Sequence, residues 1–169
     1  MSAGGVSHGD LSRKIQACLS TLQGVVNRLK AFRDDLPKMV EDVVASKEDD
    51  IVSAVADDQL YRKGIDGREV EIMSYAPYAP RTIAKKRRKG QPTNRVTLRD
   101  TGRFHGGMKL VFSDDGFYVT STDSKTEKLK TKYGDAKLRP TEQNLKLILR
   151  GPIRKEFIKR LKGIIYARK

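Results

Sequence analysis

The feature that most constrains this fold is a stripe of apolar residues near the start of the chain. Between positions 11 and 32 they follow one another at steps of one, three and four: Leu11, Ile15, Cys18, Leu19, Leu22, Val25, Val26, Leu29 and Phe32. This spacing is the period of an α-helix with a single apolar face. The sequence therefore predicts a helix from about Leu11 to Arg33, with Asp10 as its N-cap and residues 1–9 as a disordered tail.

A second helical pattern follows the first. Asp34-Asp35-Leu36-Pro37 predicts a break, because proline is favourable at the first position of a new helix. The second helix is expected to carry an acidic face and to end before Gly64. Residues 10–62 are thus predicted to form a helical hairpin. Such a hairpin either covers a sheet or associates with another subunit. The apolar positions of the second helix are Met39, Val40, Val43, Val44, Ile51, Val52, Val55 and Leu60.

Two Tyr-Ala-Pro repeats, at 75–77 and 78–80, precede a dense basic run, and their tyrosines are interpreted as anchors of a loop. Cations crowded into nine residues repel one another, so this run is expected to be a flexible loop or a short charged helix ordered by an anionic partner. The alternative is a solvated loop without a partner. The candidate contact residues are Arg81, Lys85, Lys86, Arg87, Arg88, Lys89 and Arg95.

The rest of the chain predicts a β-hairpin and C-terminal helices. Met108–Phe112 and Phe117–Ser121 read as strands around an Asp115-Gly116 turn, and their adjacent apolar residues suggest partial cover on both faces. Helices are expected after Thr141, with a break at Gly151-Pro152. The predicted fold is a single α+β domain over residues 10–169. It comprises a helical hairpin at 10–62, a small antiparallel sheet with a long basic loop at 63–140 and C-terminal helices at 141–169.

Charge is distributed unequally along the chain. The formal net charge is +14, with −3 in residues 1–59 and +17 in residues 60–169. The basic part favours a polyanion, either nucleic acid or an acidic protein surface. Cys18 is the only cysteine, so the sequence predicts neither a disulfide framework nor a cysteine zinc site. A chain with one cysteine is expected to be made in a reducing cytoplasm. No apolar run is long enough to cross a bilayer, which predicts a soluble protein with no membrane contact.

One trio resembles a catalytic motif. Asp100-Thr101-Gly102 has the sequence of an aspartic-protease loop, but Arg99 and Arg103 flank it and favour an ionised carboxylate. The structural interpretation is a turn in which Asp100 or Thr101 caps a short helix and Gly102 accepts a strained conformation. No P-loop or nucleophile motif occurs, and the two histidines, His8 and His105, do not predict a metal site. The sequence predicts no enzyme and no cofactor.

A family resemblance begins at Leu98-Arg99-Asp100-Thr101-Gly102-Arg103-Phe104. A basic loop at 82–89, followed by this turn and a hairpin at 108–121, resembles the tail-completion and head–tail joining proteins of long-tailed bacteriophages. The family related to the phage Mu G protein has this order. Tyr133-Gly134 corresponds to the aromatic-glycine pair of the family. The chain departs from the family pattern before that pair, where it has Lys132 in place of a histidine.

The resemblance implies a non-enzymatic structural protein of the virion. It would form a homo-oligomeric ring at the head–tail junction, contacting portal, neck or tail-tube proteins and packaged DNA. Rings need contacts between two different patches, and the acidic face of residues 41–58 is expected to meet basic residues of a neighbouring copy. The alternative is a basic nucleic-acid-binding protein that uses phosphate contacts.

Overall fold

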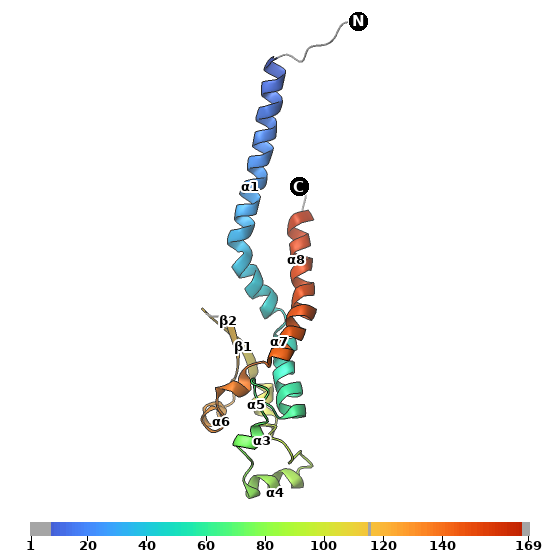
Figure 1. Ribbon diagram of the computed structural model, residues 1–169. Helices are drawn as coiled ribbons and strands as arrows, with labels where there is room; N and C mark the ends of the chain where they lie inside the picture. The colour runs from blue at the N-terminus through green and yellow to red at the C-terminus, as the bar shows by residue number, and fades with distance from the viewer. Residues whose placement is uncertain (1–7, 115, 167–169) are drawn as a thin grey trace. The chain divides into compact units, whose positions relative to one another are not determined.

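The computed structural model describes residues 8–114 and 116–166, which are mostly helical with one two-stranded antiparallel sheet (Figure 1). The chain divides into two compact units, one that ends at Val40 and one that begins at Glu41. The predicted long N-terminal helix, small antiparallel hairpin and C-terminal helix are all present. Within the described ranges, none of the helices combines the length and the apolar character that a membrane span requires.

Helix α1 runs without interruption from His8 to Ala45 (Figure 1), so the predicted break at Asp34–Pro37 is wrong. Pro37 lies inside the helix and is exposed. A proline there removes the hydrogen bond to the Arg33 carbonyl and its ring crowds that carbonyl, but on an exposed face the carbonyl can tilt outward and bind water. Asp10 lies within the helix instead of capping it, and residues 1–7 of the expected tail lie outside the described residues.

The predicted second helix is distributed over three elements, and its first part, from Pro37 to Ala45, belongs to α1. The chain turns at Ser46-Lys47, forms α2 (Glu48–Ser53) and continues as a wide π-helix, η1 (Ala54–Lys63). Gly64 ends η1 in the left-handed conformation, at φ 68°, as its position in the sequence predicts. The helical hairpin over residues 10–62 is therefore not confirmed. Its expected second helix is interrupted at Ser46-Lys47, and α2 and η1 belong to the compact unit that begins at Glu41.

The predicted β-hairpin is confirmed as β1 (Met108–Ser113) and β2 (Gly116–Ser121). The strands pair antiparallel, with Leu110 opposite Val119. Leu110 and Val119 are buried on one face of the sheet. On the other face Lys109 and Tyr118 are exposed, but Val111 and Thr120 are half-buried. One face is therefore packed and the other is covered in part, as the adjacent apolar residues predict. Asp115 of the expected turn lies outside the described residues. Glu48 of α2 accepts a hydrogen bond from the Leu110 amide at 2.7 Å and joins α2 to β1.

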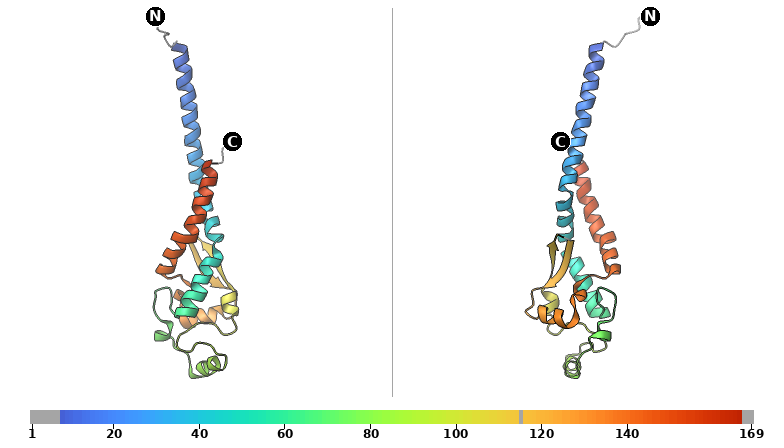
Figure 2. Two further views of the ribbon diagram at one scale, coloured as in Figure 1. Left: turned by 90° about the vertical axis from the view of Figure 1, so that its right-hand side faces the viewer. Right: turned by 60° about the vertical axis from the view of Figure 1, so that its left-hand side comes forward.

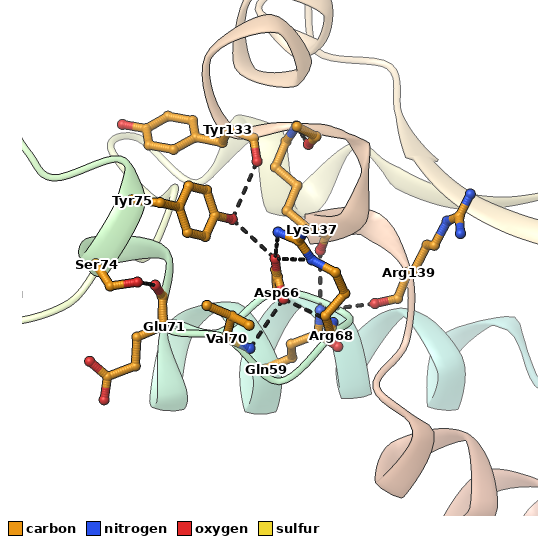
Figure 3. A network of polar contacts seen from close by, with 11 residues as sticks. Gln59, Asp66, Arg68, Val70, Glu71, Ser74, Tyr75, Tyr133, Lys137 and Arg139 are labelled. Atoms are coloured by element: carbon orange, nitrogen blue, oxygen red, sulfur yellow. Dashed lines mark hydrogen bonds and ion pairs between the residues drawn. The ribbon is translucent and has the colours of Figure 1, made fainter.

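The segment before the Tyr-Ala-Pro repeats contains one antiparallel β-bridge, between Ile65 and Glu71. Helix α3 (Ile72–Tyr75) follows. The buried carboxylate of Asp66 holds this segment, as Figure 3 shows: it accepts hydrogen bonds from the Arg68 guanidinium at 2.6 and 3.0 Å and from the Tyr75 hydroxyl at 3.2 Å. Burial raises the pKa of Asp66, but the hydrogen bonds from the Arg68 side chain and from the Arg68 and Val70 amides, together with the Arg68 charge, outweigh it, and the pKa is lowered.

The C-terminal part consists of α6 (Thr126–Tyr133), the 3₁₀ turn η2 (Asp135–Leu138), α7 (Glu142–Ile148), the π-helical η3 (Leu149–Ile153) and α8 (Arg154–Tyr166). Thr141 caps α7 by accepting a hydrogen bond from the Asn144 amide. The break predicted at Gly151-Pro152 is wrong, because both residues lie in η3 and the helix continues. A π-helical turn is wider than an α-helical one, and it accommodates a proline that lacks the amide hydrogen.

The core of the body, residues 41–166, is built by short segments around η1. Val55 and Leu60 are fully buried there, together with Ile51, Ile72, Val96 and Val119. Gln59 is also fully buried and joins η1 to the C-terminal part: its amide nitrogen donates to the Arg139 carbonyl at 2.9 Å, and its oxygen accepts from the Thr141 amide at 3.0 Å. Every polar atom of this buried side chain is thus satisfied.

Candidate functional site

The basic run folds as a helix. Helix α4 (Pro80–Arg88) begins with Pro80 at its first position, after an extended Ala79. The long basic loop of the predicted fold is therefore wrong over this run, and the short charged helix is the arrangement found. Within the body, α4 lies at the end away from the tip of the β1–β2 hairpin (Figure 2).

Lys86 anchors α4 and is not part of its surface. Its side chain is buried, and its ammonium donates to the Arg99 carbonyl at 2.8 Å, to Thr97 Oγ1 at 3.1 Å and to Gln91 Oε1 at 3.2 Å. An ammonium group carries three hydrogens, so each has an acceptor. Lys86 was expected to contact a partner, and its burial contradicts that role. The sequence does contain a signal for the burial of Lys86. In a helix, Lys86 lies on the same side as Ile83, an apolar residue three positions earlier that is itself partly buried.

Tyr78 completes this anchor, as the sequence predicts for the tyrosines of the repeats. Its ring lies beneath the Lys86 ammonium, 5.1 Å from the ring centre. Its hydroxyl accepts a hydrogen bond from the Thr97 amide at 2.8 Å. The side chain is buried. Helix α4 is thus held to the segment at 96–99 through a cation, a ring and backbone groups.

Asp100 binds two cations, one in α4 and one at the C-cap of that helix. Lys85 Nζ lies 2.7 Å from Asp100 Oδ2, and Lys89 Nζ contacts Asp100 Oδ1. The hydrogen bonds from Lys85 and then Lys89 hold the pKa of Asp100 down at about 2. The carboxylate is therefore ionised throughout the physiological range. Such a group neither shares a proton with a second carboxylate nor acts as a general acid there.

The solvent-exposed side of α4 is cationic. Arg81, Lys85 and Arg88 recur at steps of four and three and therefore share one side of the helix, and all three are exposed. Arg87 is exposed on another side. We call the set Arg81, Lys85, Arg87, Arg88 and Lys89 the α4 cationic surface. Arginines on a fixed helix present donors in defined directions to phosphate or carboxylate groups.

Arg95 belongs to a different environment. Its guanidinium donates to the Tyr61 carbonyl at 2.9 Å and to the Asn94 side chain at 3.0 Å. Its Cβ lies close to Gly64, where an added methyl group would come within 2.7 Å of it. Arg95 thus stabilises the end of η1. The structure does not bring it onto the α4 cationic surface.

The Asp-Thr-Gly trio forms a turn that leads into a short helix, as the structural interpretation predicts. Gly102 adopts φ 90° and precedes α5 (Arg103–Gly106). This conformation strains residues that have a side chain. Neither Asp100 nor Thr101 caps α5, because Gly102 occupies the N-cap position and no side chain bonds to the helix start. The expected side-chain cap is wrong, while the expected glycine turn is confirmed.

His105 lines a cavity that the sequence gives no reason to expect. The cavity has a volume of about 340 Å³, and its walls include Asp49, Asp57, Arg99 and Gly102. His105 Nε2 lies 2.8 Å from the Thr97 carbonyl and donates to it, whereas the buried Nδ1 has no hydrogen-bond partner. Burial lowers the pKa of His105. The described residues contain no group of three potential metal ligands.

The acidic face of residues 41–58 is partly used within the chain. Besides Glu48, Asp58 pairs with Lys63 at 2.8 Å, and Asp57 accepts a hydrogen bond from Ser53 at 3.0 Å. Glu41, Asp42, Asp49 and Asp50 are exposed. The face available to a neighbouring copy is consequently smaller than the sequence suggests.

Helix α1 presents a second exposed surface, which we call the α1 stripe. Its seven large apolar residues are all 40–62% exposed: Leu11, Ile15, Leu19, Leu22, Val25, Val26 and Leu29. Single exposed apolar residues are ordinary on a protein surface, but a continuous row of them along one helix marks an interaction site. The sequence predicts the row and leaves open whether a sheet or a subunit covers it.

Comparison with known proteins adds no relative: the chain matches no protein-family model, no curated protein and no solved structure.

Proposed function

We propose that this protein is a non-enzymatic structural component of a virion that joins head and tail as a homo-oligomeric ring. Its partners would be portal, neck or tail-tube proteins, with packaged DNA beside it, and it would reside at the head–tail junction. The order of basic segment, Asp-Thr-Gly turn and hairpin supports this role through its resemblance to the joining family. The structural observation that carries the proposal is the α4 cationic surface.

The anchoring of α4 suits a surface that docks on another protein. Lys86 and Tyr78 fix the helix to the body through contacts on its inner side, and Asp100 fixes Lys85 and Lys89. A surface that is ordered before binding loses less conformational entropy on association. Arg81, Arg87 and Arg88 then face solvent in fixed positions, which favours a defined acidic patch on a partner.

The ring contact proposed here uses two different patches of each copy. Exposed acidic residues such as Asp49 and Asp50 would meet basic side chains of the next copy, as a head-to-tail contact requires. Such exposed ion pairs are weak individually and are screened by salt. Ring formation should therefore be favoured on a partner surface or at low ionic strength.

Charge reversal on α4 tests the proposal. In a phage that depends on this gene, Arg81→Glu, Arg87→Glu and Arg88→Glu together should leave separate heads and tails in electron micrographs and lower the titre at least 100-fold. Lys86 is left intact because it is an internal anchor. The matched control reverses three exposed cations elsewhere, Lys125→Glu, Lys128→Glu and Arg150→Glu, and should assemble normally. Normal joining by the α4 variant would contradict the proposal.

A second candidate function is binding of nucleic acid through phosphate contacts, favoured by the same exposed arginines. It predicts DNA binding by the isolated protein that weakens steeply with salt, because each phosphate contact releases counterions. Gel-shift titrations with duplex DNA at 50 mM and 200 mM salt separate the two candidates. Tight binding with a steep salt slope, lost in the Arg81→Glu, Arg87→Glu and Arg88→Glu variant, favours the nucleic-acid function. Weak binding at both salt concentrations favours the joining function.

A further inference from the structure

Most apolar residues of α1 fall on a seven-residue repeat, and Leu19, Val26, Val40 and Val44 widen the row on one side. From position 11 to position 43, alternating steps of four and three connect Leu11, Ile15, Cys18, Leu22, Val25, Leu29, Phe32, Leu36, Met39 and Val43. Two apolar positions per seven residues, sustained over four repeats, are typical of helices that pack against other helices as a coiled coil. We refer to these ten positions as the α1 seam.

Only part of the seam is available to a partner. Met39 and Val43 are buried, and Phe32 and Leu36 are half-buried. The positions from Leu11 to Leu29 are exposed, over about 27 Å of helix. A partner helix therefore has to make its seam contacts at positions 11–36.

We propose that α1 pairs in solution with α1 of a second copy of this chain, in antiparallel orientation. In the register that fits the free part of the seam, Leu22 of one copy lies opposite Val25 of the other. The adjacent layers then place Cys18 opposite Leu29, and the outermost layers place Leu11 opposite Leu36. The same side chains serve both copies, so the contact is two-fold and self-complementary.

The charges that flank the seam favour this orientation and this register. Antiparallel pairing at positions 11–36 sets Lys14 of each copy beside Asp35 of the other, and it creates no like-charge pair at the flanks. A parallel pair would instead set Arg28 beside Arg33 of the partner. Such a like-charge pair is unfavourable in a coiled coil.

The two neighbouring antiparallel registers are less favourable, one because of charge and the other because of burial. A shift of one repeat toward the N-termini brings Lys14 beside Arg28 of the partner. A shift of one repeat in the other direction requires Val43, which is buried in its own protomer. The chosen register also sets Leu19 beside Val26 of the partner, which covers the remaining apolar residues of the α1 stripe.

This inference does not rest on the proposed function. A two-fold contact closes at two copies, whereas a ring contact continues from copy to copy. The pair therefore describes the free protein before assembly. It uses the α1 stripe and leaves the α4 cationic surface and the acidic residues at 41–58 unoccupied.

Cross-linking of the full-length protein tests the register. The variant Leu29→Cys places a second thiol opposite Cys18 of the partner, and Leu29 is 62% exposed, so the substitution leaves the protomer core intact. Under copper–phenanthroline oxidation it should form a covalent dimer at least ten times faster than the control Asn27→Cys, whose new thiol lies on the opposite side of the helix. Peptide mapping should join Cys18 to position 29. An equal rate for the two variants, or rapid linkage of Cys18 to Cys18 in the native chain, would overturn the proposal.

A charge swap tests the orientation without altering the seam. Lys14→Glu alone and Asp35→Lys alone should each weaken the dimer about ten-fold in sedimentation equilibrium, since each dimer contains the pair twice. The double variant should restore the native dissociation constant. Positions 14 and 35 lie about 32 Å apart on one helix, so rescue requires a second chain. A native protein that sediments as a monomer and binds phosphatidylglycerol vesicles would assign the stripe to a lipid surface and overturn the proposal, as would a double variant as weak as either single one.

Discussion

Helix α1 and the body contain the same kinds of apolar residue, but most of those of α1 are exposed and those of the body core are buried. Leu22 and Leu29 of α1 are more than half exposed, while Ile51, Val55 and Leu60 of the body are fully buried. The more regular pattern belongs to α1, and the more complete burial belongs to the body. Periodicity therefore predicts the helix, but it does not show whether the same chain covers its apolar face.

The two regions also differ in how their charges are used. Lys86 of the body is buried with all its donors satisfied, and Asp66 is buried among donors. The flanking charges of α1, such as Asp35, are exposed. The body is consequently a self-contained folding unit, whereas α1 carries the features of an interface. Three predictions test this contrast, in order of the size of the expected effect.

The largest difference is expected between core and stripe leucines. Leu60→Ala should lower the free energy of unfolding by about 3 kcal/mol, because it removes buried methyl groups and leaves a cavity. Leu22→Ala should change it by less than about 0.5 kcal/mol, since Leu22 is exposed in the protomer and alanine favours helix. Urea denaturation at a concentration low enough for monomers measures both. If both variants lose the same free energy of unfolding, Leu22 is packed within the protomer as Leu60 is, and the contrast is wrong.

An intermediate effect is expected at Lys86. Lys86→Met keeps most of the aliphatic volume but leaves the acceptors on Thr97, Gln91 and Arg99 without their donor, which should cost about 2 kcal/mol. Arg87→Met, on the exposed side of the same helix, should cost less than about 0.5 kcal/mol. Chemical denaturation of the two variants measures the difference. If both substitutions are tolerated equally, Lys86 is not an anchor.

The smallest expected effect on the free energy of unfolding comes from the ion pairs of Asp100, and it depends on pH. Its pKa is about 2 in the folded chain against the ordinary value of 3.8, so the interaction stabilises the fold above pH 3.8 and is lost as the pH falls toward 2. Its side chain is 41% exposed, so screening by solvent limits the contribution to about 0.5 kcal/mol. Asp100→Asn should therefore be less stable than the native chain at pH 6 and equally stable near pH 2. Thermal unfolding at both values checks this, with Asp114→Asn as the control; a gap that persists at pH 2 would contradict the assignment.

Local signals predicted the parts of the fold that local chemistry decides. The hairpin from Met108 to Ser121 follows from its strand pattern, and the end of η1 follows from Gly64. The break at Pro37 was wrong because an exposed helix face lets water replace the missing hydrogen bond. The π-helical segments η1 and η3 depend on packing between distant parts of the chain, as the bond from Asn144 to the Ala54 carbonyl at 3.0 Å illustrates.

The candidate site was predicted in part of its composition and not in its arrangement. The density of cations at 81–89 predicted a cationic surface, but not that Lys86 points inward or that Asp100 binds Lys85 and Lys89. Those contacts join residues from 11 to 15 positions apart through a specific loop path. The cavity beside His105 arises in the same way, from residues of α2, η1 and α5 that no sequence motif connects.

The most direct test of the central contrast is hydrogen exchange of the native protein measured at two protein concentrations. Amides from 11 to 36 in α1 should become more protected as the concentration rises, because pairing stabilises that helix by mass action. Amides in the buried core of the body, such as those of Val55 and Leu60, should exchange at the same rate at both concentrations. If protection of α1 does not depend on concentration, its apolar stripe is not covered by a second copy and the account is contradicted.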